Sequence, residues 1–211
     1  LSVAHGGSPC PHCGGKLSER SAKMSKSLGN TVSPGLMIEQ FGADTVRLFI
    51  LFAANPTAGM DWSDSGIASN HRVMIQMASM PEKLLGWSHS PSPMDTWMLA
   101  RLKQRCAEFQ HAMDVLDLRR AVEISHYDLI KDINWYIRRG GENAELGLQI
   151  LKSWTHLVSV STPHLAEQWW QELGMDGLVS GVEFEHLAEM TDAEQSALDN
   201  ETVLRSVLDS A

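Results

Sequence analysis

Prolines and glycines divide most of this chain into segments in which apolar residues recur every three or four positions. Pro91 and Pro93 interrupt one such pattern, Gly140 and Gly141 end another, and Pro163 opens a third. This spacing predicts helices that each bury one face, and proline or glycine marks where a helix starts or stops. The expected helices span about residues 65–88, 94–113, 117–139, 143–160, 163–174 and 191 to the C-terminus. Antiparallel helices with short connections form a bundle, so the predicted fold class is mainly α.

A small irregular or αβ segment is expected ahead of this bundle. Residues 1–20, rich in glycine, proline and serine around a cysteine pair, indicate a knuckle or hairpin. A short helix should open at Pro34 and end at Gly42, and a second, buried helix should stop before Pro56. A loop over 57–62 is then expected to lead into the bundle.

Four regions follow from this pattern. Ser63 or Asp64 is expected to cap the first helix of the bundle, which places a boundary there. The regions are 1–20, a cysteine knuckle at the end of an insertion; 21–64, a loop and connecting helices; 65–175, the helical domain; and 176–211, an acidic linker and helix.

Composition limits the class of protein. The 211 residues, 43% of them hydrophobic, suffice for one medium domain or two small ones. No apolar run approaches the roughly 18 residues of a membrane-spanning helix, so no membrane partner is expected. The start has no signal-peptide pattern and no initiator methionine, which suggests a piece of a longer protein. Three cysteines do not make a disulfide framework, so a reducing compartment, the cytoplasm, is expected.

The sequence KMSKSLGN at residues 23–30 is the stretch most informative about chemistry. Two lysines supply mobile positive charges, while serine hydroxyls and freed backbone N–H groups donate hydrogen bonds to oxygen atoms. Gly29 lets the backbone turn, and the helix that starts at Pro34 places a favourable N-terminus just downstream. The composition therefore suits a polyphosphate. A solvated basic loop is the alternative, although a chance match at five fixed positions is very improbable.

Three stretches carry a family resemblance: KMSKSLGNTVSPGLMIEQFGADTVRLFILFAANP, MDWSDSGIASNHRV and, at 163–174, PHLAEQWWQELG. The segment 23–62 resembles the end of the catalytic domain of class I aminoacyl-tRNA synthetases, and most closely that of leucyl enzymes of bacterial type. The pairing of RLFILFAANP with DWSDSG favours the leucyl enzymes over the related valyl, isoleucyl and methionyl enzymes. The third stretch resembles one that recurs in the helical bundles of these enzymes.

The resemblance implies ATP-dependent attachment of leucine to tRNA(Leu) in two steps, through leucyl-adenylate. It implies that Lys26, supported by Lys23, stabilises the triphosphate as pyrophosphate leaves, and that ATP enters with magnesium. The residues implied to contact ATP are Lys23, Met24, Ser25, Lys26, Ser27 and Asn30. A mobile loop of small polar residues fits this role.

The nucleotide-binding fold with its HIGH-type sequence, the leucine pocket and the editing domain of such enzymes have no counterpart in these residues. The chain alone is therefore expected to be inactive. Because the amino-acid pocket is not among these residues, they do not identify which amino acid is activated. The alternatives are a fragment of a valyl, isoleucyl or methionyl enzyme, or a non-catalytic tRNA-binding module. The intact lysine pair argues against the module, which would not need a triphosphate loop.

Cys10 and Cys13, separated by two residues and followed by two glycines, have the spacing of a zinc knuckle. A tetrahedral site needs two further ligands, for which His5 and His12 are nearby candidates. Cys106 lies in an expected helix and is expected in the core. Zinc in the intact protein and a turn that needs no metal remain alternatives.

The net charge of −9 is concentrated in the tail: residues 172–211 hold ten acids and one base, Arg205. The remaining residues are neutral overall and contain local basic clusters that could meet phosphate. The candidate tRNA-binding residues are Arg101, Lys103, Arg105, Arg119, Arg120, Trp135, Arg138 and Arg139. Arg138 and Arg139 could instead complement a helix C-terminus, and Trp135 could be a core residue rather than a stacking ring. The resemblance implies a monomeric enzyme whose bundle holds the inner side of the tRNA, mainly through phosphate.

Overall fold

Side chains that cap helix starts set the boundaries of the helices. Ser63 accepts a hydrogen bond from the backbone N–H of Gly66 at 3.0 Å, and Asp117 accepts one from Arg120 at 3.0 Å. Thr191 and Glu194 form a reciprocal capping box, with N–H to oxygen distances of 2.7 and 3.3 Å. Each of these contacts satisfies an N–H group that would otherwise lack a partner in the first helical turn.

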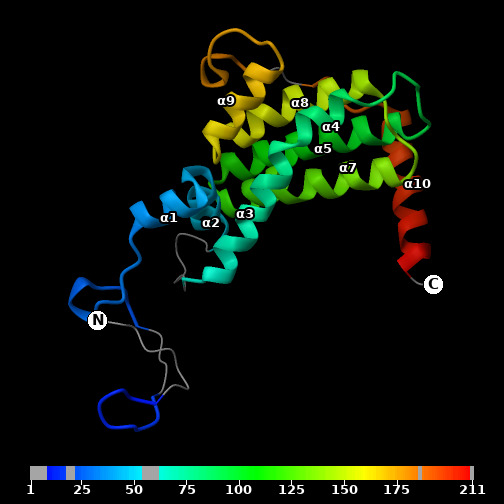
Figure 1. Cartoon of the computed structure of the whole chain (residues 1–211). Coiled ribbons are helices and arrows are strands. Elements are labelled where there is room, and N and C mark those ends of the chain that lie inside the picture. The colour runs from blue at the N-terminus through cyan, green and yellow to red at the C-terminus, as the bar shows by residue number, and fades with distance from the viewer. Residues whose placement is uncertain (1–8, 18–21, 54–61, 185–186, 210–211) are drawn as a thin grey trace.

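The computed structural model describes residues 9–17, 22–53, 62–184 and 187–209, and its helices form a bundle with a smaller helical unit at one end (Figure 1). The helices are α1 (Pro34–Phe41), α2 (Ala43–Ala53), α3 (Asp64–Ala78), α4 (Met80–Leu85), α5 (Asp95–Asp114), α6 (Leu118–Glu123), α7 (Leu129–Arg138), α8 (Ala144–Ser159), α9 (Pro163–Glu172) and α10 (Asp192–Asp209). Short 3-10 turns occupy η1 (Lys26–Leu28) and η3 (Val179–Gly181). The described ranges contain no β-strand, only two isolated bridges.

Most of the expected helices are confirmed, with two differences. The helix expected over 65–88 is two helices, because the chain turns at Ser79 before Pro81 in the first turn of α4. The helix expected over 117–139 contains a π-helical turn, η2 (Ile124–Asp128), between α6 and α7. The loop expected over 57–62 lies almost wholly outside the described residues, as does His5.

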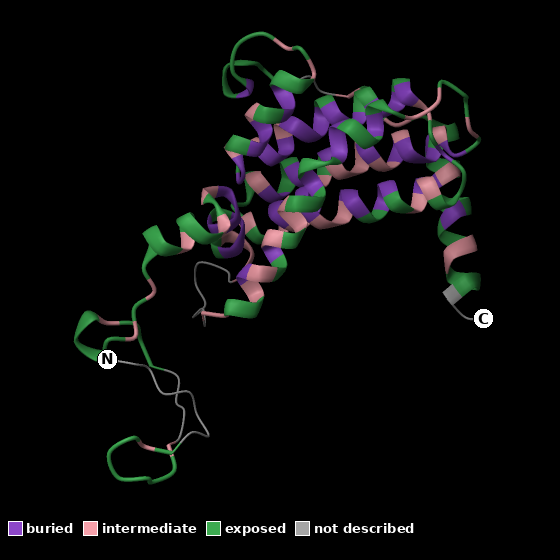
Figure 2. Cartoon of the chain, in the orientation of Figure 1, coloured by how far each residue is buried: buried purple, intermediate pink, exposed green. Residues whose placement is uncertain are grey.

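Two separate cores hold the molecule together, and buried residues concentrate between the helices of the bundle (Figure 2). The large core runs through the bundle and includes the fully buried Trp154 and Trp169. Cys106 belongs to it, as expected. The small core consists of Val46, Phe49 and Ile67, packed against side chains of α1 and α2. Helix α3 contributes to both cores, so it links the smaller unit to the bundle.

The acidic tail is part of the bundle. Helix α10 packs against α5, and its Leu198 is buried in the large core. Glu194 and Glu201 are also buried, and they accept hydrogen bonds from Lys103 and Trp135. Residues 182–184, within the expected linker, are irregular and follow η3. Among the described residues, none of the helices is long and apolar enough to span a membrane.

Candidate functional site

The loop at residues 23–30 is a turn held together by its own polar side chains, and it lies beyond α1, away from the bundle (Figure 1). Ser25 caps η1 by accepting a hydrogen bond from the N–H of Leu28 at 3.2 Å. The side-chain oxygen of Asn30, Oδ1, accepts from the Ser25 N–H at 2.8 Å, and its side-chain nitrogen, Nδ2, donates to the Lys23 backbone carbonyl at 3.3 Å. Gly29 adopts φ 65°, a left-handed conformation that glycine adopts without strain.

This turn presents Lys23 and Lys26 to solvent on either side of Ser25. Both lysines are exposed, and Ser27 is exposed with its hydroxyl 3.2 Å from that of Ser25. The arrangement offers two ammonium groups and two hydroxyls to one anion. Asn30, which the sequence suggested as a contact for ATP, is bonded within the loop and therefore fixes its shape.

Cys10 and Cys13 lie in one tight hairpin. The Cys10 N–H donates to the Gly15 carbonyl at 2.8 Å, and Pro9 and Lys16 form an antiparallel bridge that closes the turn. Backbone N–H groups of His12 and then Cys13 stabilise the thiolate and lower the pKa of Cys10 below its ordinary value. The hairpin thus supplies two thiol ligands of the kind zinc uses. No group of three metal-ligating side chains is found among the residues that the structure describes.

Three of the candidate tRNA-binding residues, all on α5, are paired within the bundle. Arg101 and Arg105 both contact Asp132, at 3.2 and 2.8 Å. Lys103 points to the other side of α5 and contacts Glu194 at 2.8 Å. These cations are largely buried and neutralise buried carboxylates, so their role in the fold is to satisfy those charges.

Arg119 and Arg120 on α6 are half-exposed and partly paired. Arg119 contacts Glu123 at 3.2 Å and also lies over the Phe52 ring, with its guanidinium carbon 5.4 Å from the ring centroid. Arg120 contacts Asp128 at 2.9 Å and Glu108 at 3.0 Å. Both guanidinium groups retain exposed surface that an external phosphate could reach.

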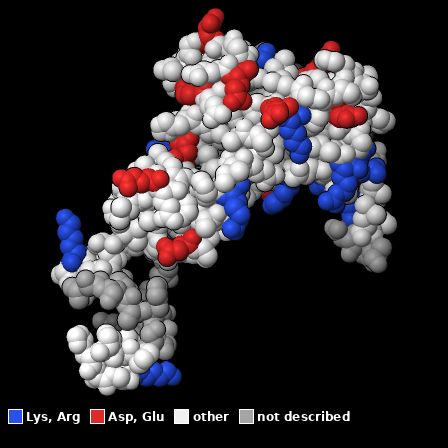
Figure 3. Space-filling model, in the orientation of Figure 1, with Lys and Arg blue, Asp and Glu red and all other residues white. Residues whose placement is uncertain are grey.

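A basic cavity of about 600 Å³ lies between α7 and α10 and brings the remaining candidates together. Its lining residues are Lys131, Trp135, Arg138, Arg139, Arg205 and Leu208. Figure 3 shows Lys and Arg side chains following the lower side of the bundle toward α10. Two carboxylates pair with its cations: Glu201 contacts Arg139 at 3.2 Å and accepts from Trp135 at 2.7 Å, and Asp128 contacts Lys131 at 3.3 Å. The cavity wall therefore carries an excess of positive charge.

The Trp135 ring contacts two guanidinium groups of this basic cavity. The ring centroid lies 5.6 Å from the Arg138 guanidinium carbon and 4.5 Å from the Arg205 guanidinium carbon. The Arg205 guanidinium carbon also lies 5.0 Å from the centroid of the Trp97 ring. Two buried nitrogen atoms of Arg205, Nε and Nη2, have no hydrogen-bond partner among the residues that the structure describes. Burial lowers the pKa of Arg205 from its ordinary value. An anion near this guanidinium would compensate for its desolvation.

Lys131 and Arg205 are two cavity residues that the sequence reasoning missed. Lys131 lies one helical turn before Trp135, so helical spacing from that candidate could have identified it. Arg205 is the single base in the acidic tail, and that isolation was a signal that it has a specific partner.

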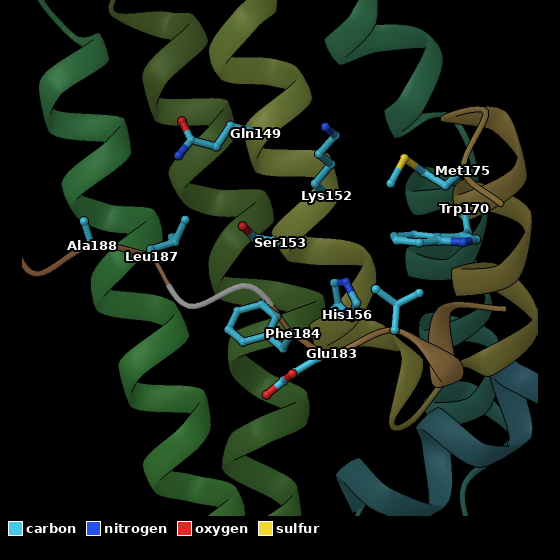
Figure 4. Close-up of a pocket in the computed structure, with 11 residues that line it drawn as sticks. Gln149, Lys152, Ser153, His156, Trp170, Met175, Glu183, Phe184, Leu187 and Ala188 are labelled. Atoms are coloured by element: carbon cyan, nitrogen blue, oxygen red, sulfur yellow. The ribbon is translucent and has the colours of Figure 1, made fainter. Parts of the chain in front are cut away.

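A second cavity, of about 320 Å³, lies where the segment after α9 crosses α8 (Figure 4). His156 meets the rings of Trp170 and Phe184 edge-on, at centroid distances of 5.4 and 5.5 Å. Burial lowers the pKa of His156. Lys152 and Glu183 also line this cavity, so it lacks the cationic excess of the α7–α10 cavity.

The fold and these surfaces define a class: a helical bundle joined to a smaller helical unit that carries a turn with two exposed lysines. Residues 95–209 match the model of the family described as the anticodon-binding domain of tRNA ligase. Residues 16–63 match the family described as tRNA synthetases class I (I, L, M and V). The chain belongs to the family of anticodon-binding domains of tRNA ligases and carries the adjoining segment of a class I synthetase domain.

Its relatives agree with the resemblance to leucyl enzymes. The chain is 35% identical to a leucine–tRNA ligase of Archaeoglobus fulgidus over 169 residues, which are 79% of the chain and 18% of the relative. It is 33% identical to that of Methanosarcina mazei over 172 residues, with the same coverages. The chain thus spans about a fifth of the length of these relatives.

A solved structure shares the fold. It is the crystal structure of the ternary complex of Agrobacterium radiobacter LeuRS with tRNA and LeuAMS, matched with a TM-score of 0.65 and 22% identity. The match covers 83% of this chain and 23% of the solved one. The prediction of a mainly α bundle of the anticodon-binding type is confirmed.

Proposed function

We propose that this chain is the part of a leucine–tRNA ligase that supplies the ATP-stabilising loop and the tRNA-binding bundle. The observation that carries the proposal is the joining, in one chain, of a preformed lysine turn to a bundle with a cationic cavity. The relatives named leucine–tRNA ligase support leucine as the amino acid. The intact enzyme would work in the cytoplasm, as a monomer.

At the loop, Lys26 and Lys23 would contact the triphosphate of ATP, which enters with magnesium. Preorganised donors of this kind contribute about 3–4 kcal/mol each when charge develops in a transition state. Ser25 and Asn30 would keep the turn in shape, because their side chains bond within it. Leu28 and Leu36 are exposed, which fits a surface that the remainder of a catalytic domain covers.

On the bundle, the tRNA backbone would lie along α6 and α7 and enter the α7–α10 cavity. Lys131, Arg138 and Arg205 are the principal phosphate contacts in this proposal, with Arg119 and Arg120 at the other end of the surface. Arg101, Lys103 and Arg105 contribute indirectly, because their ion pairs hold α5 against α7 and α10. Trp135 would support the cations that stack on it.

For zinc, Cys10 and Cys13 would supply two of four ligands in the intact protein. Backbone donors already favour the thiolate of Cys10, which is the form that binds metal. Zinc would add structural stability to the knuckle, and the other two ligands would come from elsewhere in the longer protein.

The tRNA-binding surface is tested with the chain itself. Filter binding of tRNA(Leu) transcripts across a salt series should give a steep slope of log affinity against log salt. Arg138→Gln and Lys131→Gln should each weaken binding and reduce the slope by about one. Lys152→Gln, an exposed lysine on α8, is the matched control and should change neither. Equal effects of all three substitutions would reject the cavity as the binding surface.

The catalytic assignment is tested by leucine-dependent pyrophosphate exchange. The chain alone should show none, whereas the full-length enzyme should show exchange that falls by about 100-fold or more in Lys26→Ala. A non-catalytic tRNA-binding module is the second candidate, and the absence of exchange in the unmodified full-length protein would favour it. Normal exchange in Lys26→Ala would instead reject the role of Lys26. The exposed lysine pair argues against the module, because both side chains are free of ion pairs among the described residues.

A further inference from the structure

The N-terminus of α9 is capped by a side chain from a distant helix. Thr162 stands at the capping position, but its hydroxyl is bonded to the Val158 carbonyl at 3.1 Å and to His126 Nε2 at 3.0 Å. Asp44 of α2 takes its place: its carboxylate accepts from the Leu165 N–H at 2.8 Å. This contact is buried, so the carboxylate meets both a free donor and the positive end of the α9 dipole.

A cation of α2, Arg47, holds the C-terminus of α8. Arg47 Nε donates to the Ser161 carbonyl at 2.9 Å, and Nη2 donates to the Val160 carbonyl at 3.3 Å. These carbonyls lie directly after the end of α8 and have no partner in that helix. A guanidinium at a helix C-terminus is favourable, and its fork can bind two carbonyls at once.

Asp44 and Arg47 therefore hold, with opposite charges, the two helix ends that flank the corner at residues 160–162. Asp44 also contacts the His164 side chain of α9 at 2.8 Å. Asp44 and Arg47 are three residues apart on α2 and lie on the same face. A rotation or slide of α2 would break both contacts together. The pair thus fixes the orientation of α2 relative to α8 and α9.

Helix α2 in turn holds α1, the helix that follows the loop. The small core joins α1 to α2 and α3, with Met37 and Phe41 of α1 packed against Val46 and Phe49. The loop at residues 23–30 leads directly into α1. Farther along α2, Phe52 stacks on Tyr127 at a centroid distance of 4.8 Å. The orientation of α1 relative to the bundle, and with it the point from which the lysine turn extends, is consequently set through α2.

We propose that Asp44 and Arg47 are positioning residues for transfer of the aminoacyl group to tRNA. This inference rests on the proposed function. Amino-acid activation needs the loop and ATP, whereas transfer also needs tRNA on the bundle to be aligned with the catalytic centre. Loosening the corner should impair transfer while leaving activation intact, because misplacement by about 1 Å can cost a reaction up to 100-fold.

The test uses the full-length enzyme and measures two reactions. Asp44→Ala and Arg47→Met should lower kcat/KM for tRNA in leucylation by about tenfold or more, while pyrophosphate exchange stays within about twofold. Asp44→Asn retains an acceptor for the Leu165 N–H and should restore most of the activity. In the double variant, the loss should be smaller than the product of the single losses, because both contacts hold one corner.

Tyr136→Phe is the matched control for destabilisation alone. It removes a buried hydroxyl that donates to Asp95 at 2.5 Å and accepts from the Asn143 N–H at 3.2 Å, far from the corner. It should lower the thermal midpoint without changing the ratio of leucylation to exchange. Equal losses of leucylation and exchange in Asp44→Ala, or no loss of either, would overturn the inference. An unmodified enzyme that does not leucylate tRNA would instead overturn the proposed function.

Discussion

Lowering the pH from about 7.5 to about 5 should destabilise this chain by about 2 kcal/mol through one buried histidine, His126. The ring is fully buried in the π-helical turn between α6 and α7. Its nitrogen atoms contact the hydroxyl groups of Ser125 at 2.9 Å and Thr162 at 3.0 Å, and a hydrogen bond with the Val122 backbone partly opposes the effect of burial. Burial lowers the pKa of His126 from 6.5 to about 3.

The magnitude follows from the difference between the folded and unfolded states. The unfolded chain binds a proton at His126 below its ordinary pKa of 6.5, whereas the folded chain does not until about pH 3. The stabilisation is therefore complete above about pH 6.5 and is lost as the pH falls from there toward about 3, by up to about 1.4 kcal/mol per unit. The pKa of His156 is also lowered by burial, so it acts in the same direction.

Carboxylates add little in this pH window. Burial alone would raise the pKa of Asp128 and of Glu194. Arg105 beside Asp128 and Lys103 beside Glu194 outweigh burial, so the pKa of each carboxyl lies below its ordinary value. Both groups stay ionised in the folded state above about pH 5, and their contribution is lost only at lower pH. A pH dependence between about 5 and 7.5 therefore reports mainly on histidine.

Urea unfolding followed by tryptophan fluorescence measures the effect, because Trp154 and Trp169 are fully buried. His126→Gln, which keeps a polar group near Thr162, should show a pH-dependent loss smaller by about 2 kcal/mol. Proton NMR of the unmodified chain provides a second measurement: the His126 ring should not titrate between about pH 7.5 and 5. An identical pH dependence in both proteins, or a native His126 that titrates near 6.5, would refute the reasoning.

Two further predictions concern packing and the loop. Gly147→Ala should destabilise the chain by about 1–3 kcal/mol in thermal unfolding, because its Cβ would stand 2.7 Å from the Leu84 carbonyl oxygen. Gly181→Ala, which has open space around it, should cost less than about 0.5 kcal/mol. In the full-length enzyme, Asn30→Ala should raise the KM for ATP about tenfold in pyrophosphate exchange by releasing the turn, whereas Asn200→Ala on α10 should not.

Helix boundaries were predictable where a residue acts locally. Gly42 ends α1 with φ 84° and Ser63 caps α3, both as expected, and Asp117 caps α6 at the expected start of its helix. These residues impose their conformation or their hydrogen bond within a few positions, so one sequence contains the whole interaction. The lysine loop was recognisable for the same reason, because its ligating groups lie within eight residues.

Long-range partners were not predictable in this way. Arg101, Lys103 and Arg105 formed a basic cluster in the sequence, yet two of them face α7 and the third faces α10. Helical spacing identifies the face on which a charge lies but not the carboxylate that the fold brings to it. The π-helical turn was missed because a single extra residue changes the helical phase without a proline or glycine to mark it.

The division expected near residue 64 separates elements that depend on one another physically. The small core has three buried side chains, and units below about 40 residues rarely bury enough apolar surface to fold alone. Helix α3 nonetheless continues from this core into the large one, and Asp44 and Arg47 tie α2 to the α8–α9 corner. The smaller unit therefore takes its stability from the bundle. It follows that α1, which the lysine turn precedes, and the proposed tRNA-binding surface belong to one cooperative structure, although the sequence predicts them in different domains.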